Sequence, residues 1–286
     1  MNRAPNQKVG IIGLGIIGSG ITSALRNEGV HVYVWNRTPK PEPDFLGSLG
    51  EMADLTDLIQ IFVRDGEALR EVLEGLAPRL RPEHIILNHA TVAPKDTEWA
   101  AELVQSKGAA FLDAPFTGSK MAAKGGALAY YVGGDKEVLE KVRPILEKAS
   151  KHIVHVGKIG DATVLKIATN MISATTVQVL SEALAVVRSQ GLSMEKMVDA
   201  MEVNACSSGL TGMKLPSILE NDFEPHFSLK NMFKDAQFAL DMATDAGIQI
   251  PALSATAGAM FAMMGKGEGE KDYSVLVEHE GLKTGS

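Results

Sequence analysis

A single lysine interrupts a long apolar segment in the second half of the chain. Residues 160–180 read GDATVLKIATNMISATTVQVL, and Lys166 is the only charged residue between positions 162 and 181. In a helix, spacings of three and four would put Lys166, Thr169, Asn170 and Ser173 on one face. A lysine on so apolar a helix is costly unless it reaches solvent, pairs with an anion or takes part in a reaction. The residues alone leave these three interpretations open.

A glycine-rich motif near the N-terminus indicates a phosphate-binding turn. The stretch VGIIGLGIIGSGI contains Gly13-x-Gly15-x-x-Gly18. The first two glycines permit a tight turn and close approach of a pyrophosphate to a helix N-terminus, and the third lets helix and strand pack closely. A glycine-rich turn without a ligand is the alternative. Because a strand is predicted before the motif, a helix after it and a second strand at 31–36, we predict dinucleotide binding.

The end of the second predicted strand indicates which dinucleotide. An NAD site usually has an acid there, which binds the ribose 2′-hydroxyl and would repel a 2′-phosphate. This chain has Asn36, Arg37 and Thr38 instead. A guanidinium can bind a phosphate through two hydrogen bonds, so the sequence favours NADP(H). The alternative is that Arg37 is an ordinary surface residue.

A third segment is suited to an anionic substrate. Residues 112–126 read LDAPFTGSKMAAKGG, where a predicted strand ends in Asp-Ala-Pro and continues into Thr117-Gly118-Ser119-Lys120. Backbone N–H groups and hydroxyls at the carboxyl edge of a parallel sheet can bind a carboxylate. On spacing alone, a turn rich in small residues is an equal alternative.

The pattern of apolar residues predicts the framework that positions these segments. In the first half, helix-like segments alternate with the runs KVGIIGLG, HVYVWN, LIQIFV, HIILNHA, AAFLDAP, LAYYVGG and HIVHVG. This alternation predicts a largely parallel sheet with helices on both faces. The later pattern is helical, at 161–190, 194–204, 228–246 and 251–265. We therefore predict an α/β Rossmann-type dinucleotide-binding domain at 1–160 and an all-α substrate and dimerisation domain at 161–286, joined by a long interdomain helix.

Composition excludes several classes of protein. The chain has 286 residues, a net charge of −7 and 5% aromatics, which argues against a nucleic-acid partner. Lys, Asn, Gln or Thr interrupts each of the most apolar segments, so we expect no membrane span. The opening MNRAPNQ lacks the apolar core of a secretory signal, and the lone Cys206 allows no internal disulfide, so we expect a cytoplasmic protein. The seven histidines have no metal-ligand spacing, and we expect no metal site.

Four motifs in order make the chain resemble the β-hydroxyacid dehydrogenases over almost its whole length. This family includes 3-hydroxyisobutyrate dehydrogenase and the glyoxylate and succinic semialdehyde reductases. The family's GLGxMG, DAPVSG, KxxxN and KD resemble residues 13–18, 113–118, 166–170 and 234–235, with Ile17 in place of Met. Two segments, Gly118-Ser119-Lys120 and Asn36-Arg37-Thr38, look most like the glyoxylate and succinic semialdehyde reductases.

Two departures from the family pattern leave the substrate open. Thr117 stands where the family usually has serine, and NHATV at 88–92 replaces the more common DxSTV. The resemblance implies an NADPH-dependent reductase or dehydrogenase that interconverts a small aldehyde acid and its hydroxy acid. We also expect a homodimer or homotetramer, because the apolar helix at 161–190 has more apolar surface than one small domain can cover.

The resemblance implies a role for each site residue. Lys166 would protonate the carbonyl oxygen as hydride leaves the reduced nicotinamide, and Asn170 would hold the substrate or the lysine. Thr117, Gly118 and Ser119 would anchor the substrate carboxylate. The supporting residue would be Asp235, and the cofactor-binding residues would be Gly13, Leu14, Gly15, Ile16, Ile17, Gly18, Asn36, Arg37, Thr38, Val63, Thr91 and Lys234.

Other functions remain open at this stage. A 3-hydroxyisobutyrate dehydrogenase would use the same site with another substrate. An imine reductase has the same architecture but usually lacks the lysine, and a 6-phosphogluconate-type decarboxylating dehydrogenase would need a longer substrate loop. A non-catalytic NADP-binding module would need neither Lys166 nor Asn170.

Overall fold

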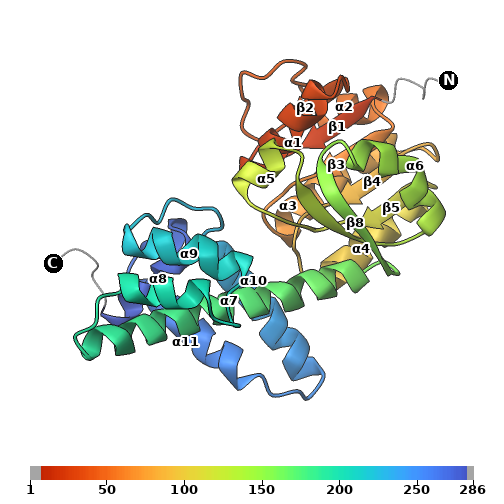
Figure 1. Cartoon of the computed structure of the whole chain (residues 1–286). Helices are drawn as coiled ribbons and strands as arrows, with labels where there is room; N and C mark the ends of the chain where they lie inside the picture. Colours follow the sequence, from red (N-terminus) through yellow and green to blue (C-terminus); the bar gives the residue numbers. More distant parts are fainter. Residues whose placement is uncertain (1–7, 282–286) are drawn as a thin grey trace. The chain divides into compact units, whose positions relative to one another are not determined.

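The protein consists of two compact units (Figure 1). The computed structural model describes residues 8–281, and the opening MNRAPNQ, on which the expectation of no secretory signal rests, lies outside them. The units comprise residues 1–166 and 167–286, so the division falls inside the helix α7 (Asp161–Ser189). The first unit is a Rossmann-type α/β domain and the second is helical, which confirms the predicted fold class.

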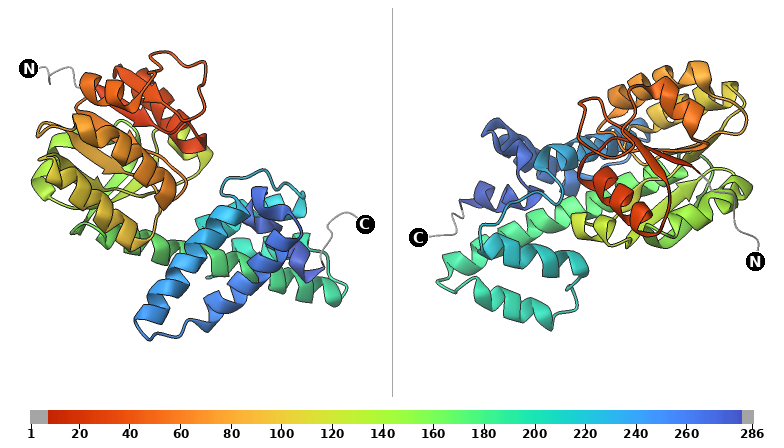
Figure 2. Two further views of the ribbon diagram at one scale, coloured as in Figure 1. Left: turned by 180° about the vertical axis from the view of Figure 1, so that it is seen from behind. Right: turned by 90° about the horizontal axis from the view of Figure 1, so that it is seen from above.

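The first unit is built on one eight-stranded sheet (Figure 2). The first five strands are parallel in the order β2-β1-β3-β4-β5, whereas β7 is antiparallel to β5 and pairs also with β6 and β8. Six of the seven apolar runs in the sequence contain a whole strand and the seventh, HIVHVG, lies inside β8, whereas the short strand β6 was not predicted. The strands are β1 (Val9–Ile12), β2 (Val32–Trp35), β3 (Leu58–Ile61), β4 (Ile85–Asn88), β5 (Ala110–Asp113), β6 (Phe116–Thr117), β7 (Leu128–Gly133) and β8 (Ser150–Gly157).

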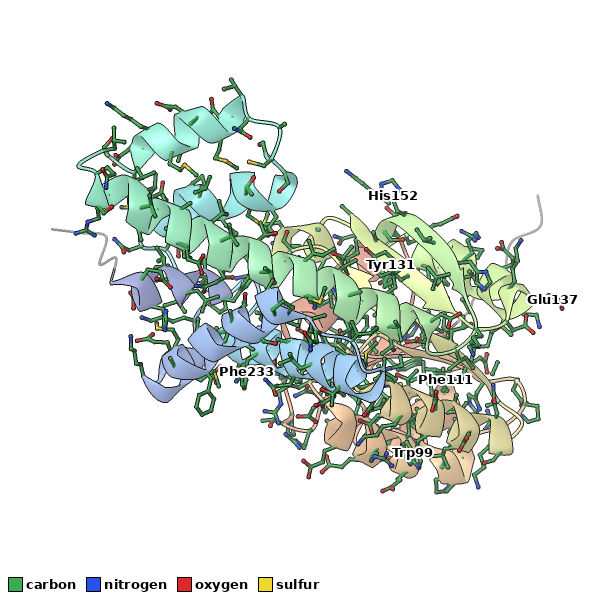
Figure 3. The ribbon with its side chains drawn as sticks, turned by 90° about the horizontal axis from the view of Figure 1, so that it is seen from below. Trp99, Phe111, Tyr131, Glu137, His152 and Phe233 are labelled. Atoms are coloured by element: carbon green, nitrogen blue, oxygen red, sulfur yellow. The ribbon has the colours of Figure 1, made fainter. Side chains whose placement is uncertain are left out.

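Helices cover both faces of the sheet because successive strand residues point to opposite sides. Leu112 of β5 packs on the face covered by α1 (Ile16–Asn27), α5 (Lys120–Lys124) and α6 (Lys136–Leu146). Its neighbour Phe111 packs on the opposite face, which α2 (Leu49–Leu55), α3 (Gly66–Leu76) and α4 (Pro94–Ser106) cover. Figure 3 labels Phe111 and also Trp99 of α4, which packs against the same cluster. The short 3-10 helix η1 (Ala77–Arg79) follows α3.

The second unit contains one helix that the sequence pattern did not predict. The predicted segments correspond to α7, α8 (Glu195–Glu202), α10 (Leu229–Asp245) and α11 (Pro251–Gly265), whereas α9 (Gly209–Leu219) is additional. Two glycines and Pro216 weaken the helical signal of α9, but a capping box between Ser208 and Thr211 stabilises its first turn. Two 3-10 segments, η2 (Glu268–Glu270) and η3 (Tyr273–Glu280), follow α11.

The long helix α7 has the length and composition of a membrane span, with a mean hydropathy of 1.3 over an 18-residue window. The core helix of a soluble protein can have the same composition. Here α7 contributes Ile167, Ala174, Val177, Leu180 and Leu184 to the core of the second unit. Packing buries only 39% of that window, so it accounts for part of the apolar character of α7. By length and composition α7 could cross a membrane, whereas the sequence pattern was expected to contain no such segment.

A buried ion pair fixes the segment that leads into α10. Lys214 of α9 lies 2.6 Å from Asp272, and both side chains are 3% exposed. Asp272 also accepts hydrogen bonds from the backbone N–H groups of His226 and Phe227, just before α10 begins. Since loss of either partner would leave a buried charge unpaired, this contact holds the start of α10 in place.

Candidate active site

The glycine-rich loop between β1 and α1 leaves open space at one position. Gly13 has a φ of +98°, and a Cβ there would lie 2.0 Å from the carbonyl oxygen of Phe62. A Cβ at Gly18 would lie 1.9 Å from the carbonyl oxygen of Gly13, so Gly18 permits close packing. A Cβ at Gly15, the N-cap of α1, would meet no atom within 4 Å. This space adjoins the N–H groups of a helix with no acid in its first turn, which favours a phosphate.

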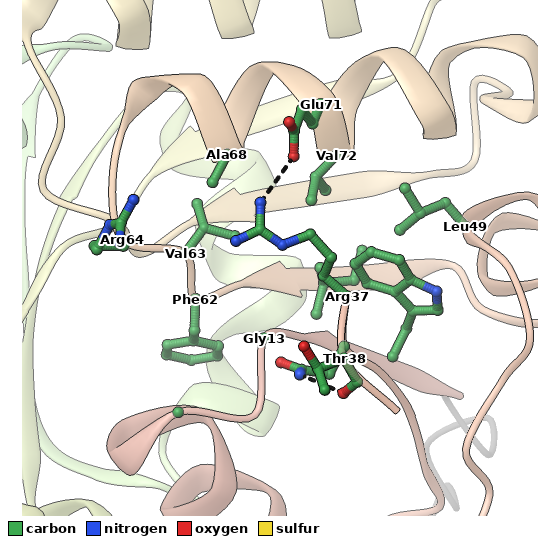
Figure 4. A pocket seen from close by; sticks show the side chains of 14 residues that line it. Gly13, Arg37, Thr38, Leu49, Phe62, Val63, Arg64, Ala68, Glu71 and Val72 are labelled. Carbon is green, nitrogen blue, oxygen red and sulfur yellow. Dashed lines mark hydrogen bonds and ion pairs between the residues drawn. The ribbon is translucent and has the colours of Figure 1, made fainter. Parts of the chain in front are cut away.

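A pocket of about 250 Å³ lies beside this loop, at the carboxyl ends of β1, β2 and β3 (Figure 4). This is the edge at which open α/β sheets bind their ligands. Six predicted cofactor residues line the pocket: Gly13, Gly15, Asn36, Arg37, Thr38 and Val63. The structure therefore brings the glycine-rich motif and the end of β2 into one site, as the sequence predicts.

Asn36 joins the glycine-rich loop to the end of β2. Its Oδ1 accepts a hydrogen bond from the N–H of Leu14 at 2.9 Å, and its Nδ2 donates to the carbonyl of Thr38 at 2.7 Å. Lys40 donates to the carbonyl of Leu14, which places another cation beside the loop. Asn36 thus has a structural role in addition to leaving the end of β2 without a carboxylate.

The other predicted cofactor residues do not line this pocket. Leu14 and residues 16–18 lie in the same loop and at the start of α1, Thr91 follows β4, and Lys234 belongs to the second unit. Conversely, the sequence did not single out Ile12, Trp35, Leu49, Phe62, Arg64, Ala68, Glu71 and Val72, which complete the lining. The end of the apolar run LIQIFV could have indicated Phe62 as a lining residue. The sequence does not show, however, that this run forms the strand next to β1, because that depends on the strand order.

The predicted substrate loop forms the turn between β6 and α5. Gly118 has a φ of +138°, and a Cβ there would lie 2.6 Å from Cδ2 of Leu128, so the position requires glycine. The Oγ of Ser119 accepts a hydrogen bond from the N–H of Ala122, a bond that does not use the hydroxyl proton. Thr117 in β6 and Ser119 are both partly exposed. The loop can therefore offer hydroxyl donors to an anion.

Asp113 fixes the start of the helix that carries Lys166, a role that the sequence did not reveal. Its buried carboxylate accepts hydrogen bonds from the N–H groups of Gly160 and Thr163 at 3.1 and 2.9 Å, and from the Thr163 hydroxyl at 2.8 Å. Because that hydroxyl donates to Asp113, it accepts from Thr97, whose Oγ1 is 3.0 Å away. Burial raises the pKa of Asp113 to about 6, and the bonds from Thr163 and Gly160 oppose that shift.

In the second unit, Asp235 holds two predicted site residues. Nδ2 of Asn170 donates to one carboxylate oxygen at 2.6 Å, and Nζ of Lys234 donates to the other at 2.8 Å. The Asp235 side chain is fully buried. Because a carboxylate only accepts, the Asn170 amide group must donate to Asp235, which leaves Oδ1 as an acceptor for an ammonium or a hydroxyl. Lys166 precedes Asn170 by one turn of α7.

A buried polar cluster surrounds His89 of the segment NHATV. The ring stacks on Phe62 at 4.4 Å, Nδ1 lies 2.6 Å from the Ala114 carbonyl oxygen, and Nε2 lies 3.0 Å from the Gln60 amide. Burial lowers the pKa of His89 to about 4, so the ring is neutral at neutral pH. Nδ1 must carry the proton because a carbonyl only accepts, and Nε2 of the neutral ring must therefore accept. The Gln60 atom beside Nε2 is Oε1, and Nε2 of Gln60 is buried without a partner among the described residues, so we assign the Gln60 amide in the flipped orientation, with its N–H donating to His89. His89 thereby links three strands of the sheet to the start of the substrate loop.

We expect His89 to reduce stability in mild acid. Its pKa is about 4 in the folded protein and about 6.5 in the unfolded chain, so the unfolded chain binds the proton more tightly. Stability is therefore lost as the pH falls from about 6.5 toward 4, by at most about 3 kcal/mol. Asp113 acts in the opposite sense, because a pKa raised to about 6 gives stability at low pH that is lost as the pH rises through 6.

A comparison of variants isolates the contribution of His89. The free energy of unfolding can be measured in urea for the wild type and for His89→Leu, at about pH 7.5 and about pH 4.5. Asp113 is present in both proteins, so its titration affects both in the same way. The free energy of unfolding of the wild type should fall on acidification relative to that of His89→Leu. His152→Leu, at an exposed position labelled in Figure 3, controls for loss of a histidine. Equal pH dependence of the wild type and His89→Leu would contradict a neutral, buried ring.

Two family models match the chain in succession. Residues 8–157 match the NAD binding domain of 6-phosphogluconate dehydrogenase. Residues 160–279 match the NAD-binding domain of NADP-dependent 3-hydroxyisobutyrate dehydrogenase. The two matches cover both units, including the glycine-rich loop, the substrate loop and α7.

Similar proteins include an enzyme and a nuclear factor. Glyoxylate/succinic semialdehyde reductase 1 of Arabidopsis thaliana is 25% identical over 95% of this chain and 97% of its own length. Cytokine-like nuclear factor N-PAC of Mus musculus is 28% identical over 82% of this chain, but this chain matches only 44% of N-PAC. The solved structure of Mycobacterium tuberculosis 3-hydroxyisobutyrate dehydrogenase with L-serine has a TM-score of 0.85 and 25% identity, covering 95% of this chain and 98% of that one.

Proposed function

Because the chain belongs to the β-hydroxyacid dehydrogenase family of NAD(P)-dependent oxidoreductases, we propose that it interconverts a small aldehyde acid and its hydroxy acid with NADP(H). Glyoxylate and succinic semialdehyde are the substrates we propose first, in line with the likeness to the Arabidopsis reductase. The observation that carries the proposal is the arrangement on α7, where Lys166 precedes an Asn170 whose amide is oriented by Asp235.

The proposed reaction reduces a carbonyl to an alcohol, with hydride supplied by the reduced nicotinamide when it is bound. Lys166 donates a proton from its ammonium to the carbonyl oxygen, and its charge stabilises the negative charge that develops there. Oδ1 of Asn170 accepts an N–H of the lysine or the substrate hydroxyl. Lys166, then neutral, regains its proton from solvent. In the reverse direction the neutral lysine removes the hydroxyl proton.

The first unit has groups suited to each part of NADP(H). The open space at Gly15 and the N-terminus of α1 suit the pyrophosphate. Arg37 and Thr38 line the pocket at the end of β2, and no carboxylate ends that strand. A guanidinium in this position can bind the 2′-phosphate through two hydrogen bonds. These observations support NADP(H) over NAD(H).

The proposal predicts that the substrate carboxylate matters for catalysis. If the hydroxyls and N–H groups of residues 117–119 anchor it, succinic semialdehyde should have a severalfold higher kcat/KM than butanal, which lacks the acid. The loss should appear mainly in KM, because the anchor lies away from the reacting carbonyl. Oxidation of NADPH, followed by its absorbance, measures both substrates. Equal kcat/KM for the two aldehydes would contradict the anchoring role.

We further propose that the protein is a homodimer or homotetramer. Ile172, Val179 and Val186 of α7 are 61%, 55% and 63% exposed and follow one another at intervals of seven residues. In a helix this spacing places the three side chains on one face, as a seam that a second copy of the helix can cover. Light scattering at micromolar concentration should therefore give at least a dimeric mass.

Matched substitutions test this seam. Val179→Glu places a charge in the proposed interface and should yield monomers. Val203→Glu makes the same change at a 90% exposed position outside α7 and should leave the oligomer intact. A wild-type monomer, or equal masses for the wild type and Val179→Glu, would contradict the proposal.

A panel of substrates distinguishes the proposed enzyme from its competitors. Turnover of 3-hydroxyisobutyrate or of a cyclic imine, with no turnover of glyoxylate or succinic semialdehyde, would identify one of the other enzymes. The likeness to a nuclear factor makes a non-catalytic NADP-binding module the second candidate. NADP+ binding without turnover of any of these compounds would favour that module. We also propose a cytoplasmic location, since a lone Cys206 suits a reducing compartment.

A further inference from the structure

Glu71 is the only acidic residue among the described residues that line the cofactor pocket. It lies in the second turn of α3, and its Oε2 is 3.4 Å from Nη1 of Arg37. Figure 4 shows Arg37 extending past Val63 and Val72 toward this carboxylate. The ion pair thus joins α3 to the end of β2 across the pocket.

This geometry sets two effects against the binding of a 2′-phosphate. Arg37 must give up part of its bond to Glu71 in order to bind the phosphate. A phosphate held by Arg37 also lies near the Glu71 carboxylate and is repelled by it. Neither effect acts on NAD(H), which has a hydroxyl at this position.

Two other cations lie near the pocket. Arg64 also lines the pocket, but its Nε bonds to Asp65 at 2.7 Å. Lys40 bonds to the carbonyl of Leu14 in the glycine-rich loop. The ion pair with Arg37 is the contact through which Glu71 can influence cofactor choice.

We propose that Glu71 is a specificity-determining residue that weakens the preference for NADP(H) by competing with the 2′-phosphate for Arg37. The inference rests on the proposed use of NADP(H). The Arg37 and Glu71 side chains are 74% and 56% exposed, and an exposed ion pair changes an equilibrium constant by at most about fivefold. Neutralising Glu71 should therefore tighten NADP+ binding by about two- to fivefold.

Cofactor titrations of the full chain test this proposal without relying on turnover. Trp35 lines the pocket, so quenching of tryptophan fluorescence can report binding. At low ionic strength, Glu71→Gln should lower the Kd for NADP+ and leave the Kd for NAD+ unchanged or higher. The gain should shrink as salt is added, because salt screens exposed charges. Glu74→Gln makes the same charge change on an exposed part of α3 outside the pocket lining and should alter neither Kd.

A second background shows whether Glu71 acts through Arg37. In Arg37→Ala, the further change Glu71→Gln should give a smaller gain in NADP+ affinity than it gives in the wild type, because the competition for Arg37 is gone and only the direct repulsion of the phosphate remains. An undiminished gain there would overturn the competition for Arg37, and an unchanged NADP+ Kd in Glu71→Gln alone would overturn the proposal. Failure of the wild type to bind NADP+ would instead refute the proposed function on which the inference rests.

Discussion

Lys166→Ala is expected to lower kcat by about 10²–10⁴-fold, the range typical of general acid catalysis. The substitution removes both the proton donor and the positive charge that stabilises the developing oxyanion. Binding of NADP+ should change little, because Lys166 is not among the residues that line the cofactor pocket. Steady-state oxidation of NADPH measures kcat, and fluorescence titration measures the Kd for NADP+.

Two further variants separate chemistry from structure at this position. Lys166→Arg keeps the charge but is a much weaker acid, so kcat should remain low. Ser173→Ala changes another residue of the same polar stripe, whose hydroxyl bonds to the Thr169 carbonyl, and should leave kcat nearly unchanged. If Lys166→Ala loses NADP+ affinity and kcat to the same extent, the assignment of Lys166 as proton donor is wrong.

The double change Asn36→Asp with Arg37→Ala should raise the KM for NADPH by at least about tenfold. A charge-assisted bidentate contact contributes about 1.5–3 kcal/mol, which the loss of Arg37 removes. A carboxylate at residue 36 can still accept the N–H of Leu14, as Asn36 does, but it repels a 2′-phosphate. Use of NADH should stay similar or improve, and the KM for the aldehyde should be unaffected.

The two single variants serve as controls for this change. Arg37→Ala tests the loss of the cation alone, whereas Asn36→Asp adds repulsion and removes the hydrogen bond to the Thr38 carbonyl. Each should raise the KM for NADPH by less than the double change does. Equal use of NADH and NADPH by the wild type would show that Arg37 is an ordinary surface residue.

Local signals in the sequence predicted much of the fold. Each of the seven apolar runs contains a strand or lies inside one, and predicted helices such as 251–265 coincide with or lie close to the observed ones. The glycine pattern at 13–18 predicted the turn, the following helix and the close packing that Gly18 permits. The family matches then confirmed the resemblance on which the enzyme class rests. The assigned roles of Lys166, Asn170 and the substrate loop stay predictions.

Contacts between distant segments were not predictable from those signals. Asp113 bonds to Thr163, 50 residues later, and Asn170 bonds to Asp235, 65 residues later. Glu71 reaches Arg37 across 34 residues because β1 lies between two strands. One is β2, which ends just before Arg37, and the other is β3, which leads into α3. Likewise, nothing in NHATV indicated that His89 would be enclosed by Phe62, Gln60 and Ala114.

The difference has a physical cause. Periodicity, glycine turns and helix caps depend on neighbouring residues, and the order of residues in the chain specifies these local features directly. The partner of a charged or polar side chain depends instead on strand order and on which helix covers which face of the sheet. The sequence therefore identified Lys166 as a group able to donate a proton, and Arg37 and the glycine loop as groups able to bind phosphate. Only the tertiary structure decided that Asp113 bonds to the start of α7, that Asp235 bonds to Asn170 and that Glu71 pairs with Arg37.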